Sequence, residues 1–157
     1  MTTKNRKKIL YFYLIFMCIS MFIIHIRDYN ALDDFMDWSI LMNHLKNGKH
    51  INIIPFRTII TYIQDIFELQ IYHFLYIMLG NIAMFIPVGI FISKNDLKII
   101  IPFIILKELI QFILNVGSFD IDTIILNFVG ILLGVIMQKI CYKYQITYQI
   151  TYRIMQK

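Results

Sequence analysis

The sequence predicts an all-α integral membrane protein with four transmembrane helices, cytoplasmic N- and C-termini and one outer amphipathic segment. Three observations lead to this fold class. Hydrophobic residues make up 59% of the 157 residues and charged residues 16%, against about 45–50% and about 25% in soluble domains. Apolar runs of membrane-spanning length alternate with polar segments. Lys and Arg gather beside alternate ends of these runs, as the positive-inside rule requires.

The first predicted span covers residues 9–26 and follows a basic leader, residues 1–8. Its length is close to the minimum with which a helix can cross a bilayer. The residues behind it, RDYNALDD, contain no small-residue cleavage site of the kind that ends a signal peptide. We therefore interpret the run as an uncleaved signal anchor with its N-terminus in the cytoplasm.

Residues 27–71 form the one long polar segment, which we predict to be extracytoplasmic. The chain turns at Asn47-Gly48 and breaks at Pro55. Beyond Thr58, a candidate N-cap residue, apolar residues recur at three- and four-residue intervals from Ile60 to Ile71. That spacing is typical of an amphipathic helix, here one that lies on the outer surface of the membrane or leads into the next span.

Three further spans are predicted over residues 72–92, 99–114 and 123–140, followed by a basic, tyrosine-rich tail over 141–157. The leader, the short loop between the second and third spans, and the tail are rich in Lys and Arg, whereas the turn over 115–122 has neither. This distribution puts both termini in the cytoplasm and that turn outside. Because the cations cluster beside apolar runs, the net charge of +5 does not indicate nucleic-acid binding.

Polar residues interrupt the hairpin formed by the third and fourth spans. A carboxylate within a span is costly and marks a functional site by default. Glu108 lies roughly 9 Å below the outer end of its span at 1.5 Å per residue, and Gln111 and Asn115 share its helix face. Asn127 is at a similar depth in the fourth span, and Asn81 lies somewhat deeper in the second. We therefore expect a polar pocket that opens outward.

Structural roles stay open for several of these residues. Asp120 or Asp122 could cap the fourth helix, and the asparagines could bond from helix to helix. Gly130 and Gly134 form a G-x-x-x-G pair that favours close helix packing. We predict no metal site and no cofactor. The predicted ligand-binding residues are Arg57, Asn81, Glu108, Gln111, Asp120, Asp122 and Asn127.

Three motifs in this order resemble those of the VanZ-like family, small membrane proteins named for a teicoplanin-resistance accessory protein. The motifs are NIIPF over Asn52–Phe56, the N-x-x-x-F-x-P-x-G span over Asn81–Gly89, and the E-x-x-Q, D-I-D and Asn elements of the hairpin over Glu108–Asn127. The resemblance covers about residues 50–135. Thr123 replaces the second acid of the family's usual pair, and Phe128 replaces its usual Thr. The resemblance therefore does not imply a mechanism that needs three aspartates in this turn.

What the resemblance implies is a multi-pass cell-membrane protein linked to reduced susceptibility to teicoplanin-type glycopeptides. One hypothesis is a non-enzymatic accessory factor that binds a lipid headgroup, cell-wall precursor or glycopeptide, with Arg57 on an anionic phosphate. An alternative is an intramembrane enzyme acting on a lipid-linked cell-wall intermediate. Glu108 would then be the general acid or base, and Asp120 and Asp122 would orient it or hold a divalent cation. A small transporter subunit is a third possibility, disfavoured because no internal repeat is visible. Carboxylates and amides without an evident nucleophile favour the accessory factor.

Overall fold

The fold is mostly helical, which confirms the predicted class at that level. The computed structural model describes residues 3–28, 37–67 and 78–155. Two strands of two residues each, β1 (Ile51–Asn52) and β2 (Phe119–Asp120), pair in parallel. The helices are α1 (Thr3–Asp28), α2 (Trp38–Asn47), α3 (Arg57–Phe67), α5 (Gly80–Phe91), α6 (Leu97–Ile113) and α7 (Ile121–Met155), with a 3-10 helix, η2 (Lys94–Asp96), before α6.

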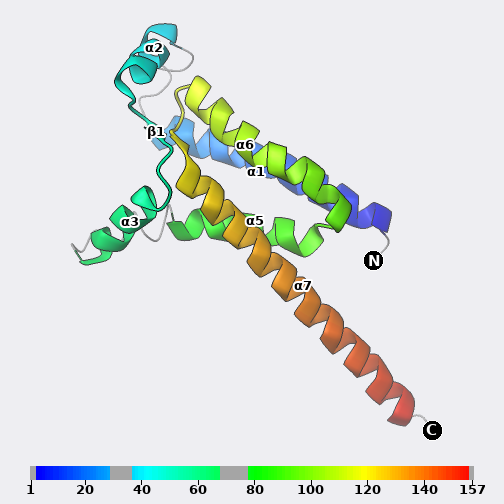
Figure 1. The fold of residues 1–157 in the computed structure, drawn as a ribbon. Coiled ribbons are helices and arrows are strands. Elements are labelled where there is room, and N and C mark those ends of the chain that lie inside the picture. Colours follow the sequence, from blue (N-terminus) through cyan, green and yellow to red (C-terminus); the bar gives the residue numbers. More distant parts are fainter. Residues whose placement is uncertain (1–2, 29–36, 68–77, 156–157) are drawn as a thin grey trace.

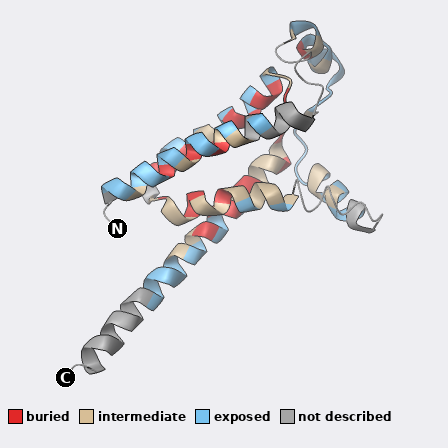
Figure 2. Cartoon of the chain, turned by 180° about the vertical axis from the view of Figure 1, so that it is seen from behind, coloured by how far each residue is buried: buried red, intermediate tan, exposed pale blue. Residues whose placement is uncertain are grey.

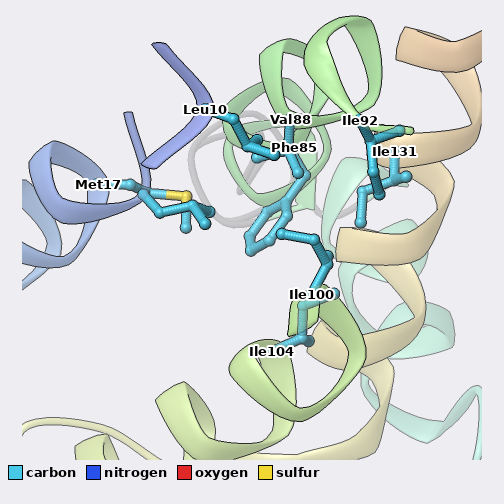
Figure 3. Packing of buried hydrophobic residues seen from close by; sticks show 9 residues of the cluster. Leu10, Met17, Phe85, Val88, Ile92, Ile100, Ile104 and Ile131 are labelled. Atoms are coloured by element: carbon cyan, nitrogen blue, oxygen red, sulfur yellow. The ribbon is translucent and has the colours of Figure 1, made fainter. Parts of the chain in front are cut away.

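The four longest elements form a bundle of alternating direction (Figure 1). Helices α1 and α6 run one way, and α5 and α7 run the other way. The start of α1, η2 and the end of α7 lie toward one end of the molecule, whereas α2, the two strands and α3 lie toward the opposite end. The apolar core sits where the four helices meet (Figure 3). Its buried members are Leu10, Leu14, Met17, Phe85, Val88, Ile92, Ile100, Ile104 and Ile131.

Helices α5 and α7 pack backbone against backbone through glycines. A Cβ atom added to Gly130 would lie 2.2 Å from the Ile82 carbonyl oxygen, and one added to Gly134 would lie 2.1 Å from that of Ile86. A Cβ atom on Gly89 would meet Gly134 Cα at 2.8 Å. Only hydrogen fits between these backbones, so the G-x-x-x-G pair works as the sequence predicted.

A hydrogen bond fixes the register of the same two helices. The Gln138 side-chain amide donates to the Ile90 carbonyl oxygen at 2.6 Å, across 48 residues. The same separation relates both glycine–carbonyl contacts described above. A constant separation over successive turns requires two helices that run in parallel. The bond also satisfies a carbonyl in the last turn of α5, where the helix itself provides no donor.

One helical segment within the described residues is long and apolar enough to cross a membrane, Ile121–Tyr144 of α7, with a mean hydropathy of 2.1. It contains the predicted fourth span, 123–140, and α7 continues as a helix through most of the predicted tail. Helix α5 is apolar but shorter. The beginning of the predicted second span, residues 72–77, lies outside the described residues. Four spans and two cytoplasmic termini stay predictions.

Large apolar side chains are exposed along the long helices, and Figure 2 marks many residues of α1 and α7 as exposed. Soluble monomers rarely expose contiguous apolar patches of this kind. A lipid environment would cover them without cost. The most exposed include Phe12, Ile15, Phe16, Ile19 and Ile23 on α1, Leu106 on α6, and Leu132 and Ile136 on α7.

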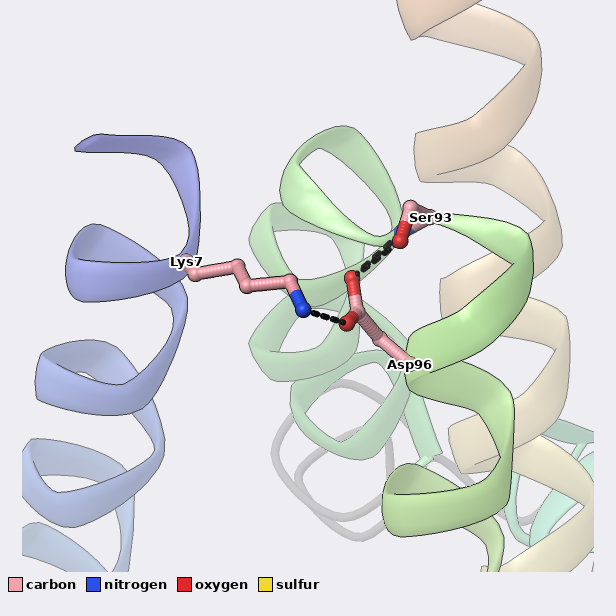
Figure 4. Close-up of polar contacts among 3 residues, drawn as sticks. All are labelled: Lys7, Ser93 and Asp96. Carbon is pink, nitrogen blue, oxygen red and sulfur yellow. Dashed lines mark hydrogen bonds and ion pairs between the residues drawn. The ribbon is translucent and has the colours of Figure 1, made fainter. Parts of the chain in front are cut away.

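An ion pair joins the basic leader to the loop between α5 and α6 (Figure 4). Lys7 Nζ lies 3.6 Å from Asp96 Oδ1. The other oxygen of this buried carboxylate accepts hydrogen bonds from the backbone N–H and the hydroxyl of Ser93, at 2.9 and 2.5 Å. Both segments were predicted from their cations to share one side of the membrane. The ion pair places them at the same end of the bundle.

The Asp96 contacts predict acid sensitivity. Burial alone would raise the pKa of Asp96, but the Ser93 hydrogen bonds and the charge of Lys7 outweigh it and hold the pKa below its ordinary value. The carboxylate therefore stabilises the fold above the unfolded pKa of about 3.9, and this contribution is lost as pH falls through the lower folded pKa. We expect Asp96→Asn to lower the thermal unfolding midpoint in detergent at neutral pH. The two midpoints should converge as pH falls through the folded pKa; a difference that stays constant with pH would contradict the assignment.

Candidate ligand-binding site

Two distant segments meet where β1 pairs with β2. Ile51 lies opposite Phe119 and Asn52 opposite Asp120. The Phe119 N–H also donates to the His50 carbonyl oxygen at 2.8 Å. The NIIPF segment and the turn before α7, which the sequence separates by more than sixty residues, are thereby brought side by side.

Asp122 holds the amino-terminal end of α3. Its carboxylate accepts backbone N–H hydrogen bonds from Phe56 at 2.6 Å, from Thr58 at 2.7 Å and from Ile59 at 3.2 Å. These are groups that a helix start leaves without intrahelical partners, and a negative charge there complements the helix dipole. Phe56 adopts a left-handed conformation with φ of 68° to make this contact. The cap of α3 is thus a fully buried carboxylate from α7, and Thr58, the candidate N-cap, is a donor to it.

Asp120 ties three elements together. Its Oδ1 accepts from the Asn52 side-chain amide at 2.9 Å and from the Asp122 N–H at 2.8 Å. Its Oδ2 accepts from the Thr58 hydroxyl at 2.7 Å. The bond to Asp122 N–H caps α7, because that helix begins at Ile121. The sequence left open which aspartate caps the fourth helix. Asp120 does so, while Asp122 caps α3.

An open pocket of about 390 Å³ lies beside this junction. Two of the predicted ligand-binding residues line it, the cation Arg57 and the carboxylate Asp120. Hydroxyl, amide and imidazole groups supply most of the remaining polar lining, so the pocket can form hydrogen bonds in several directions. The lining residues are Gly48, His50, Ile51, Asn52, Arg57, Thr58, Thr61, Tyr62, Ser118 and Asp120.

Glu108 occupies a separate, buried position. It is 2% exposed, and the adjacent Lys107 is 7% exposed. Lys107 Nζ lies 2.5 Å from Glu108 Oε1 and 5.9 Å from the centre of the Phe85 ring. A lysine within a predicted span can extend its ammonium toward the membrane surface or pair with a nearby carboxylate. Lys107 pairs locally, with the carboxylate next to it.

Asn127 of α7 is fully buried. Neither the nitrogen nor the oxygen of the Asn127 amide has a hydrogen-bond partner within the described residues. A buried amide of this kind normally binds ordered water or a polar ligand.

The predicted pocket is therefore divided in two. Arg57 and Asp120 line the open pocket beside α3, whereas Glu108, Gln111 and Asn127 are buried in the bundle. The other two predicted residues lie outside the pocket lining. Asp122 binds the first N–H groups of α3, and Asn81 is half-buried in the first turn of α5.

Contrary to the sequence prediction, Asn115 does not share a helix face with Glu108, because it lies beyond the end of α6. It takes a left-handed conformation, φ 55°, immediately after α6. Its N–H bonds to the Phe112 carbonyl and the Val116 N–H to that of Gln111, which is the Schellman pattern. The Asn115 side chain donates to the Asp37 carbonyl oxygen at 3.0 Å. Asn115 thus ends α6 and anchors α2.

Sequence reasoning did not assign site roles to Asn52, Thr58 or Lys107. Asn52 had a signal, since it begins the NIIPF motif, and Lys107 had one as a cation inside a predicted span. Thr58 is recognisable only once its hydroxyl is seen to donate to Asp120. Among the residues that the structure describes, no three His, Cys, Asp or Glu side chains are grouped so that they could hold a metal ion.

Comparison with protein families gave one match, to the family model described as VanZ/LLP1, over residues 10–142. The match extends on both sides of the 50–135 range that carries the three motifs. Comparison with curated proteins and with solved structures gave no match.

Proposed function

Because the chain belongs to the VanZ/LLP1 family, we propose that it is a non-enzymatic accessory protein of the cell membrane that lowers susceptibility to teicoplanin-type glycopeptides. Its open pocket beside α3 binds a lipid headgroup or a cell-wall component at the outer surface. In this proposal the four long helices span the membrane and both termini are cytoplasmic. The Lys7–Asp96 pair at one end of the bundle and the pocket toward the other end support that orientation.

The pocket itself is the observation that carries the proposal. Its volume of about 390 Å³ is within the range of small-molecule sites. Arg57 offers a planar set of donors that suits phosphate or carboxylate groups, and the hydroxyls of Thr61, Tyr62 and Ser118 suit sugars. This set of groups recognises a polyol or an anion.

The carboxylates favour binding over catalysis. Both oxygens of Asp120 and of Asp122 already accept hydrogen bonds that hold α3 and α7 in place. In the described part of the chain, no hydrogen bond joins Ser118 to His50, the lining residues that could act as a nucleophile and its base. Glu108 is buried away from the pocket lining and is paired with Lys107.

A bulky substitution that leaves the Asp120 and Asp122 hydrogen bonds in place tests the pocket. Thr61 is exposed and lines the pocket, so Thr61→Trp should occupy the space that a ligand needs. In a susceptible bacterium that expresses the chain, we expect Thr61→Trp to return the minimum inhibitory concentration of teicoplanin to that of cells without the protein. The control Leu45→Trp, at an exposed position of α2 outside the pocket, should retain the wild-type value. Protection that persists in Thr61→Trp at equal membrane abundance would refute the pocket's role.

A further inference from the structure

We propose that the pocket takes the phosphate-bearing headgroup of an anionic phospholipid, which Arg57 binds while α3 lies along the bilayer surface. This inference rests on the proposed function and names the ligand class for the same site. It depends on the two faces of α3, on the position of Arg57 between them, and on a guanidinium that no acceptor among the described residues occupies.

The apolar face of α3 is left uncovered by the rest of the described chain. Phe56 is 56% exposed and Ile60 is 53% exposed, with Ile63 also exposed. Successive residues of a helix are about 100° apart, so Ile60 and Ile63 project from one side of α3, and Phe56 directly precedes the first residue of the helix. The loop that leads into α3 adds Ile53 and Ile54, both exposed. A helix with such a face, at the end of a membrane bundle, lies in the interface with its apolar side among the acyl chains.

The polar face of α3 forms one wall of the pocket. The helix residues that line it are Arg57, Thr58, Thr61 and Tyr62, which by their spacing project from the side opposite Ile60 and Ile63. When the apolar face is in the acyl region, the pocket is therefore level with the lipid headgroups. A ligand at that depth is a membrane-attached molecule rather than a free solute.

Arg57 lies at the boundary between the two faces. It follows Phe56 directly, it is exposed, and it lines the pocket. Within the described residues, no carboxylate or other acceptor occupies its guanidinium. Arginine binds phosphate oxygens in pairs and is weakly hydrated, which suits an interfacial site. The one carboxylate in the lining, Asp120, already accepts three hydrogen bonds from the protein. These hydrogen bonds reduce the repulsion between Asp120 and a phosphate in the pocket.

Lipid retention by the purified full-length chain in detergent tests this assignment. Dioleoylphosphatidylglycerol, dioleoylglycerol and glycerol 3-phosphate are titrated separately, and bound molecules are counted by native mass spectrometry. The first has phosphate and chains, the second has chains only, and the third has phosphate only. We expect the phospholipid to bind most tightly and Arg57→Gln to weaken it about tenfold, the loss of one charge-assisted bond. Lys46→Gln, at an exposed cation of α2 outside the pocket, should leave binding unchanged.

The apolar arm compares Ile60→Ser with Leu45→Ser, both at exposed positions. Ile60→Ser should weaken the phospholipid and leave glycerol 3-phosphate unaffected, and Leu45→Ser should change neither. If glycerol 3-phosphate competes at equal concentration and Ile60→Ser has no effect, the site takes free phosphate and the lipid assignment fails. It also fails if dioleoylglycerol binds as tightly as the phospholipid, or if Lys46→Gln weakens binding as much as Arg57→Gln.

These outcomes are independent of the antibiotic test. Should Thr61→Trp remove protection while the lipid arms fail, the pocket keeps its function and the ligand class is wrong. Should Arg57 prove to hold the phospholipid while Thr61→Trp keeps protection, the ligand class stands and the role in susceptibility falls.

Discussion

Glu108→Leu is expected to reduce the free energy of unfolding by about 3–5 kcal/mol, because it leaves the buried Lys107 ammonium without its counter-charge. The pair is nearly inaccessible, with side chains 5% and 3% exposed and 2.5 Å between Lys107 Nζ and Glu108 Oε1. Total stabilities of about 5–15 kcal/mol make this a large fraction. Thermal unfolding of the purified chain in detergent, followed by loss of the monodisperse fraction, would measure it.

The matched control removes both charges. Lys107→Met combined with Glu108→Leu should recover most of the lost stability, since replacing a buried pair by apolar groups of similar volume is often neutral or stabilising. If this double variant also protects cells against teicoplanin, Glu108 is structural and proton-transfer chemistry at that carboxyl is excluded. A stable double variant without protection would instead restore the enzymatic alternative, with Glu108 as general acid or base.

Gly134→Ala is expected to disrupt the packing of α5 on α7. The added Cβ atom would lie 2.1 Å from the Ile86 carbonyl oxygen and 2.7 Å from Gly89 Cα. Both neighbours are backbone atoms, so the helices themselves must separate. We expect a loss at the upper end of the roughly 1–3 kcal/mol that overpacking costs, or more, seen as a lower unfolding midpoint and reduced yield of folded protein.

Gly80→Ala provides the comparison for this variant. Gly80 is also helical, but an added Cβ atom there would meet nothing within 4 Å. The exchange should be neutral or stabilising by up to about 1 kcal/mol, from helix propensity alone. Equal midpoints for Gly134→Ala and the wild type would contradict the close α5–α7 contact.

The local features of the fold were predictable from the sequence. α2 ends at the predicted Asn47-Gly48 turn, with Gly48 in the left-handed conformation that suits glycine. Gly130 and Gly134 lie in the predicted helix contact, and the apolar periodicity after Pro55 does form a helix, α3. Each of these depends on the residue's own backbone preference or on a periodicity within one element.

The candidate site was predicted only in part. Composition and periodicity identified Glu108, Gln111 and Asn127 as polar residues at one depth of the hairpin, and the structure buries all three. Sequence spacing orders residues along one helix, but it does not say which face a neighbouring element covers. The open pocket beside α3 is lined from β1, α3 and β2 and contains Arg57 and Asp120 of the predicted residues, and the binding role of all seven stays a prediction.

By itself, the sequence determined a helical, lipid-compatible chain, the glycine pair at which another helix packs closely, and the family to which the motifs belong. Only the tertiary structure decided that Asp122 caps α3 and that Asp120 joins Asn52 to Thr58. The physical reason is the range of these contacts. Any free N–H group at a helix start can donate to a carboxylate. The N–H group of Thr58, which Asp122 accepts from, is 64 residues away in the sequence. The two meet because the β1–β2 pairing sets the register between these distant segments.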